Sequence, residues 1–169
     1  MQQQRFQDCF STTFSSYLSM LNYHEMQSQT SLWTRCPVKD LYVEPLNLAS
    51  ALAAEDGFAP GISKEAVYDT MENLGLAIRV NGAYYPVRET AYRSLLGRAK
   101  IGGTALPKLE KQKLADVLNN CLQLFKRDAL VLVRDEKVSA VHSGDDADYS
   151  VLPIDELLKT LQMKLDVRF

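Results

Sequence analysis

The sequence predicts a single α+β domain, with an antiparallel or mixed sheet built from two hairpins (76–87 and 129–142) plus short strands, and helices packed mainly on one face. Two pairs of β-prone runs are each joined by a tight polar connection, Asn81-Gly82 in the first and Arg134-Asp-Glu-Lys137 in the second. Between them, apolar residues recur every three or four positions, as on one side of a helix. The 169 residues, 46% hydrophobic and 24% charged, suffice for a core without disulfides or a structural metal.

The helical spacing begins in the first thirty residues, where aromatic and apolar side chains share one side of a predicted helix: Phe6, Phe10, Phe14, Tyr17 and Leu21. Residues 27–34 have no period and are expected to form a loop. A short strand at 41–43, a short helix at 46–54 and a turn at 56–61 follow.

The first hairpin is preceded by a helix that Ser63 can cap and that Gly75 can end in the left-handed conformation. Within the hairpin, Asn81-Gly82 suits a turn in which both central residues need positive φ. Pro86 cannot donate a ladder hydrogen bond, so the second strand is expected at an edge of the sheet.

Three more helices are predicted. The first carries Tyr92 and Leu95 on its apolar face and is expected to end at Gly102-Gly103, and the second starts near Pro107. The third follows the second hairpin and starts at Pro153, and residues 165–169 are expected to form a strand. Residues 1–169 are therefore expected to form one domain, either complete or the N-terminal part of a longer protein.

The charge distribution is uneven, although the net charge is only −2. Residues 76–115 carry eight basic and two acidic side chains, with tyrosines between them. Basic side chains neutralise phosphates and aromatic rings stack on bases, so this segment predicts an interface for DNA or RNA. An ordinary solvated face is the alternative. The predicted nucleic-acid-binding residues are Arg79, Tyr85, Arg88, Arg93, Arg98, Lys100, Lys108 and Lys111.

No catalytic residue, metal site or cofactor is predicted. The glycines at 97–103 follow a helix, whereas phosphate-binding loops follow a strand. The two histidines and three cysteines lack the spacing of zinc ligands. A hydrolase or metal-dependent enzyme is the least favoured alternative; it would use His142 with Ser143, with Cys36 or with the carboxylates at 145–148.

The cellular setting expected from the sequence is the cytoplasm. The three cysteines are odd in number and scattered, as is typical of reduced thiols. The N-terminus lacks the order of a secretory signal, and no apolar run approaches the ~20 residues that span a bilayer. A membrane partner is therefore not expected.

A series of short motifs runs from residue 88 to residue 160. It includes Leu114-Ala-Asp-Val-Leu-Asn119, Leu130-Val-Leu-Val-Arg134, Val138-Ser-Ala-Val-His-Ser143 and Tyr149-Ser-Val-Leu-Pro-Ile-Asp155. Their order resembles the phage- and plasmid-related proteins filed as domain of unknown function 932. The loop from Ser143 to Tyr149 departs from that family, because five residues stand between its ends where the family has about two.

The resemblance implies an origin in a mobile element and supplies no catalytic residues. The leading hypothesis is thus an accessory protein of a phage or plasmid that binds nucleic acid through its basic segment. The alternative is a protein-interaction or structural module, in which the aromatic N-terminal helix docks on a second copy or on another protein of the element.

Overall fold

The computed structural model describes residues 13–46, 57–143 and 153–165. Five α-helices and six strands lie in these ranges, with two short 3-10 helices at Val38–Asp40 and Leu106–Lys108. The elements in chain order are α1 (Tyr17–Gln29), β1 (Ser31–Cys36), β2 (Tyr42–Pro45), α3 (Lys64–Glu72), β3 (Leu76–Val80), β4 (Ala83–Pro86), α4 (Glu89–Ala99), α5 (Lys111–Leu122), β5 (Ala129–Arg134), β6 (Lys137–Ser143) and α6 (Ile154–Leu165).

The strands form two three-stranded antiparallel sheets, with orders β1-β5-β6 and β2-β3-β4. Each predicted hairpin supplies two strands of one sheet, and a strand from the N-terminal part of the chain adds the third. The sheets meet where Val87, just after β4, forms a parallel bridge with Val138 of β6. Next to it, the backbone N–H of Arg88 donates to the Val138 carbonyl at 2.9 Å. The α+β class and both hairpins are confirmed.

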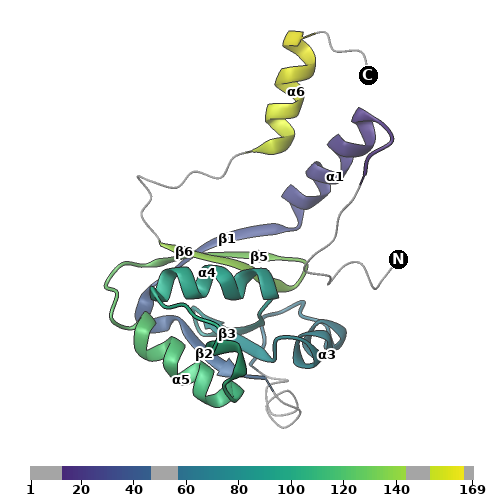
Figure 1. Ribbon diagram of the computed structural model, residues 1–169. Helices are drawn as coiled ribbons and strands as arrows, with labels where there is room; N and C mark the ends of the chain where they lie inside the picture. The colour runs from purple at the N-terminus through teal and green to yellow at the C-terminus, as the bar shows by residue number, and fades with distance from the viewer. Residues whose placement is uncertain (1–12, 47–56, 144–152, 166–169) are drawn as a thin grey trace.

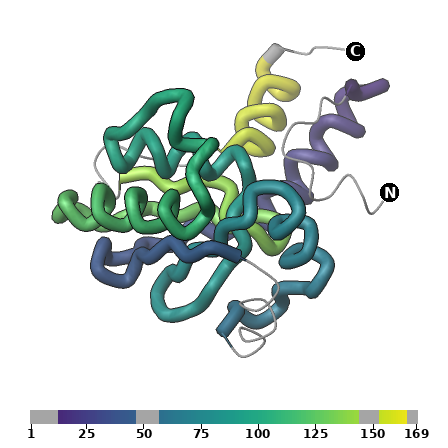
Figure 2. Tube along the Cα trace, turned by 60° about the horizontal axis from the view of Figure 1, so that its bottom comes forward, coloured from purple at the N-terminus to yellow at the C-terminus, as the bar shows by residue number. Residues whose placement is uncertain are grey.

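One hydrophobic core joins the two sheets with α4 and α5, which Figure 1 shows together in front of them. Leu95 of α4, Leu118 of α5, Ile78 of β3 and Val131 of β5 are all fully buried in this cluster. These helices therefore cover a common side of the sheets. Helices α1 and α6 instead lie side by side and project from the body, as Figures 1 and 2 both show.

The two hairpin turns reach positive φ in different ways. Asn81 and Gly82 adopt φ of 50° and 91°, as their residue types predict. The second turn places Asp135 and Glu136 at φ of 47° and 68°, in the left-handed region that aspartate adopts more readily than glutamate. The Glu136 carboxylate accepts hydrogen bonds from the Ser63 backbone N–H, at 2.8 Å, and from its hydroxyl. This contact with the first residue before α3 helps to hold the strained turn.

The open edge of β2 is closed by Asn119, a buried residue of α5. Its side-chain oxygen accepts from the Val43 N–H and its amide donates to the Val43 carbonyl, both at 2.8 Å. One turn later, the Gln123 amide donates to the Val38 carbonyl at 2.9 Å. At Val43, helix α5 thus supplies the hydrogen bonds that a further strand would make, and Gln123 ties the same helix to the 3-10 turn before β2.

Two expectations for the N-terminal part are wrong. Residues 27–34 are not a loop, because Ser31–Cys36 pair with β5 as strand β1. The first helix begins at Tyr17, after a capping box in which the Ser16 and Ser19 side chains bond each other's backbone N–H. It continues to Gln29, so most of it lies beyond the predicted aromatic face; Phe6 and Phe10 are outside the described residues.

The predicted ends of the middle helices also need correction. Helix α4 ends at Ala99 because Lys100 adopts the left-handed conformation (φ 54°), before Gly102-Gly103 is reached. Pro107 lies in a 3-10 turn, and α5 starts at Lys111. Two predicted helix starts are confirmed: Ser63 caps α3, and α6 begins directly after Pro153. The predicted helix at 46–54 and strand at 165–169 lie almost entirely outside the described residues.

Candidate functional site

Helix α4 runs along β6 and uses two side chains one turn apart to bond its backbone. The Ser94 hydroxyl accepts from the Val141 N–H at 2.8 Å. The Arg98 guanidinium donates to the His142 carbonyl at 3.2 Å and to the Arg127 carbonyl at 2.6 Å. These bonds close the edge of β6 and tie the last turn of α4 to the segment before β5.

Two of the predicted nucleic-acid-binding arginines are therefore not on a solvated face. Arg98 is 6% exposed and Arg88 is 7% exposed. Burial lowers the pKa of Arg98, an effect that the nearby acidic groups Cys36 and Asp128 oppose. Their positions show that Arg88 and Arg98 belong to the folded core.

The other predicted residues lie on different elements. The Arg79 guanidinium lies over the Tyr42 ring, 5.9 Å from its centroid, on the sheet β2-β3-β4. Tyr85 is half-buried and packs against the core. The remaining four are exposed, on the outer side of α4 or around the start of α5: Arg93, Lys100, Lys108 and Lys111. They do not form one continuous row with Arg79.

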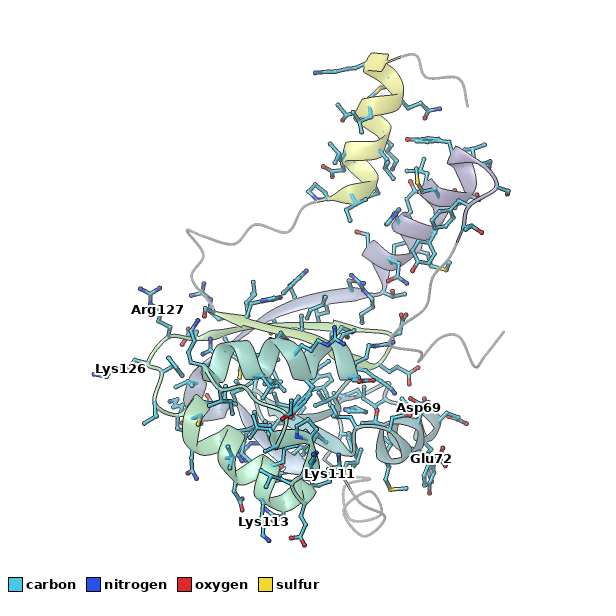
Figure 3. The ribbon with its side chains drawn as sticks, in the orientation of Figure 1. Asp69, Glu72, Lys111, Lys113, Lys126 and Arg127 are labelled. Atoms are coloured by element: carbon cyan, nitrogen blue, oxygen red, sulfur yellow. The ribbon has the colours of Figure 1, made fainter. Side chains whose placement is uncertain are left out.

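Further basic residues lie near the end of α4 and in the connection before β5. Lys100 ends α4, and Arg98 connects that turn to the exposed pair Lys126 and Arg127. Figure 3 shows Lys126 and Arg127 together, at the opposite end of the body from Asp69 on α3. We call Lys100, Lys126 and Arg127 the basic corner. Lys126 and Arg127 are not among the residues predicted from the sequence. The available signal was two adjacent basic residues between a predicted helix and a predicted strand.

His142 lies beside an aromatic ring near the end of β6. Its ring centroid is 6.0 Å from that of Trp33 on β1. Side chains alternate along β6, so His142 and Ser143 point to opposite faces. Cys36 is fully buried, and burial raises the pKa of its thiol. Burial also lowers the pKa of His142, which favours the neutral ring.

Metal and membrane sites are not visible in the described part of the chain. No three His, Cys, Asp or Glu side chains gather there in a way that could hold a metal ion. The acidic cluster at 145–148 lies outside the described residues. Within the same ranges, no helix has the length and apolar character needed to cross a membrane.

The projecting pair of helices, α1 and α6, forms what we call the arm. Lys159 of α6 and Glu25 of α1 form an ion pair at 2.5 Å. Among the described residues ten large hydrophobic side chains are exposed, and the arm carries six of them. These six are Leu18, Met26, Ile154, Leu157, Leu161 and Met163.

A groove of about 330 Å³ lies at the base of the arm, between α1, β1, the end of β5 and the start of α6. Tyr23, Trp33 and Asp155 are among its lining residues. Arg134 also lines it, and its guanidinium donates to the Ser31 hydroxyl at 2.9 Å. The groove combines aromatic surface with one cation and one carboxylate where the arm meets the sheet.

A scan against protein-family models returns no match to this chain. Searches of curated proteins and of solved structures also return none.

Proposed function

We propose that this protein is an interaction module that docks on a protein partner through the arm. The observation that carries the proposal is the concentration of exposed apolar side chains on α1 and α6. Leu157 and Leu161 are each 42% exposed and Met163 is 78% exposed. Large apolar patches on soluble proteins commonly mark interaction surfaces.

The energetic gain from covering the arm is substantial. Full burial of one such side chain contributes about 2 kcal/mol, and the six are roughly half exposed, so covering all six would contribute on the order of 6 kcal/mol. Part of this is offset by the entropy lost on association. The remainder is compatible with a weak, specific complex.

Oxidation of methionine tests the proposal directly, because Met26 and Met163 on the arm are exposed while Met71 on α3 is half-buried. Peptide mapping after peroxide treatment would compare the dilute purified chain with the chain in native lysate. Protection of Met26 and Met163 in the lysate, relative to Met71, is the expected result. Equal oxidation rates at both arm positions in the two samples, in a chain that also stays monomeric at every concentration, would refute the proposal.

The resemblance of residues 88–160 to the phage- and plasmid-related family supports placing this module in an accessory protein of a mobile element. On that proposal, the partner is a second copy or another protein of the element.

Nucleic-acid binding is a second candidate, and the basic corner is the observation that favours it. The three cations of the basic corner would contact the phosphate backbone and not the bases, so binding would be independent of sequence. Binding of a DNA duplex and of single strands across a salt series tests it. Affinity should fall as salt rises, with about one unit of log–log slope lost for each phosphate contact removed.

The variant for that test reverses the three charges at Lys100, Lys126 and Arg127, and its control is Lys64→Glu on α3, far from the corner. Binding that is absent at low salt, or that the triple reversal leaves unchanged, would rule this candidate out.

A further inference from the structure

We infer that the arm's partner is a second copy of this chain, and that the two copies pair α6 with α6 in antiparallel orientation about a two-fold axis. The inference rests on the proposed function of the arm and names its partner. Three features of α6 carry it: where its open face lies, how its apolar positions are spaced, and how its charges are distributed.

The open face of α6 is the one turned away from α1. Lys159 reaches Glu25, and Leu158 is half-buried, so α1 occupies that side of the helix. Leu157 and Leu161 on this face are each 42% exposed, while Ile154, which is 43% exposed, lines the groove at the base of the arm. The four-residue spacing of Leu157 and Leu161 places them one turn apart along one stripe. This stripe is the seam available to a partner helix.

The seam is complementary to a copy of itself. When two α6 helices lie antiparallel with Leu157 of one opposite Leu161 of the other, the two-fold axis places Leu161 opposite Leu157 as well. Each leucine then packs against a leucine, as an isologous interface requires. The same alignment places Ile154 near the last turn of the other copy.

The charges at the two ends of α6 favour the same orientation. The first turn carries Asp155 and Glu156, and the last turn carries Lys164. Antiparallel pairing brings the acidic first turn of each copy next to the basic last turn of the other, whereas parallel pairing would bring like charges together. The helix dipoles also oppose each other in this orientation.

The size of the seam sets the expected affinity. Twelve residues of helix extend over only about 18 Å, so this contact resembles a small, transient interface and not an obligate one. A dissociation constant in the micromolar range is expected. The dimer would therefore be visible by sedimentation at tens to hundreds of micromolar chain and would dissociate on dilution.

Sedimentation equilibrium of the full chain tests the inference. The mass should rise from 19.0 kDa at low concentration towards twice that value. The double variant Leu157→Asp, Leu161→Asp should stay monomeric over the same range, with an unchanged circular dichroism spectrum because both positions are exposed. Leu124→Asp, at a position that is 78% exposed beyond the end of α5, is the matched control and should dimerise like the original chain.

A charge exchange tests the orientation. Lys164→Glu alone and Glu156→Lys alone should each weaken dimerisation at least tenfold at low salt, and the two together should restore it to within about threefold. A double variant as weak as the single ones would overturn the antiparallel pairing. A dimer that survives Leu157→Asp with Leu161→Asp would overturn the α6 seam.

The outcome for the proposed function can be separated from the outcome for this inference. A purified chain that stays monomeric at every concentration, while Met163 is protected from oxidation in lysate, would refute the second copy and leave the interaction module standing. Dimerisation that rises with chain concentration and that Leu157→Asp with Leu161→Asp abolishes supports both.

Discussion

The contact between Asn119 and the backbone of Val43 makes the sharpest test of how this fold is held together. Asn119→Ala removes both hydrogen bonds at once, each 2.8 Å long in the native chain. Val43 is fully buried and Asn119 is 6% exposed, so water has little access to the backbone groups that lose their partner. Those groups sit on the outer edge of β2, where no further strand in the described part of the chain replaces the lost bonds.

The cost of the substitution follows from two unsatisfied buried groups. Each costs about 1–3 kcal/mol, which gives roughly 2–6 kcal/mol. Alanine favours the helix by about 0.6 kcal/mol over asparagine and offsets part of this. The expected loss in the free energy of unfolding is therefore about 1.5–5 kcal/mol, a large share of the roughly 5–15 kcal/mol that typical domains possess.

Urea unfolding followed by far-ultraviolet circular dichroism measures this loss. Asn120→Ala is the matched control, because Asn120 is the next residue of α5 and is exposed. It should change the free energy of unfolding by less than about 0.5 kcal/mol, as surface substitutions usually do. If Asn119→Ala were no more destabilising than Asn120→Ala, the view that α5 closes the edge of β2 would be wrong.

Three further measurements follow from other parts of the body. Arg98→Ala should destabilise the fold by about 2–4 kcal/mol, because it removes a buried guanidinium that donates to the His142 and Arg127 carbonyls. The exposed Arg93→Ala should change the free energy of unfolding by less than about 0.5 kcal/mol, and similar losses for both would contradict the buried role of Arg98. Burial favours the neutral form of His142, so its pKa in the folded chain lies below the ordinary value of 6.5 that it has in the unfolded chain. The contribution of neutral His142 to stability is therefore fully present above pH 6.5 and is lost as the pH falls through the lower pKa of the folded chain. A pH titration of the fluorescence of Trp33, the single tryptophan, should therefore show a step with a midpoint below pH 6.5, and this step should be absent in His142→Gln. A midpoint at or above pH 6.5 would show that burial does not control the pKa of His142. The Cys36 thiol has a raised pKa and no exposed surface, so thiol reagents at pH 8 should label it only after urea unfolding. Mass spectrometry maps the labelled position, and rapid labelling of Cys36 in the folded chain would be inconsistent with its burial.

The features that sequence predicts well are those set by neighbouring residues. Asn81-Gly82 determines its turn because both residues tolerate positive φ, and the observed angles agree. The cap at Ser63 is equally local, since its hydroxyl accepts from the Ala66 N–H three residues on, at 3.3 Å. Such contacts need no information about the rest of the chain.

The features that sequence misses depend on residues far apart in the chain. Strand β1 has mixed polar and apolar residues and becomes a strand because it pairs with β5, about a hundred positions away. Arginine is a residue type that commonly binds phosphate, yet the Arg98 guanidinium donates hydrogen bonds to the backbone carbonyls of Arg127 and His142. A count of basic residues cannot tell these two environments apart, because charge alone does not indicate burial.

The closed sheet edges bear on how this protein can meet a partner. Asn119 occupies both backbone groups of Val43 in β2, while Ser94 occupies the Val141 N–H of β6. A partner that adds a strand to either edge would first have to displace these side chains from buried positions, which costs more than an open edge would. Among the described residues, helices α1 and α6 instead carry six exposed large hydrophobic side chains. Docking through the arm therefore requires no rearrangement of the core, and side-chain packing between helices is the mode of association that this architecture favours.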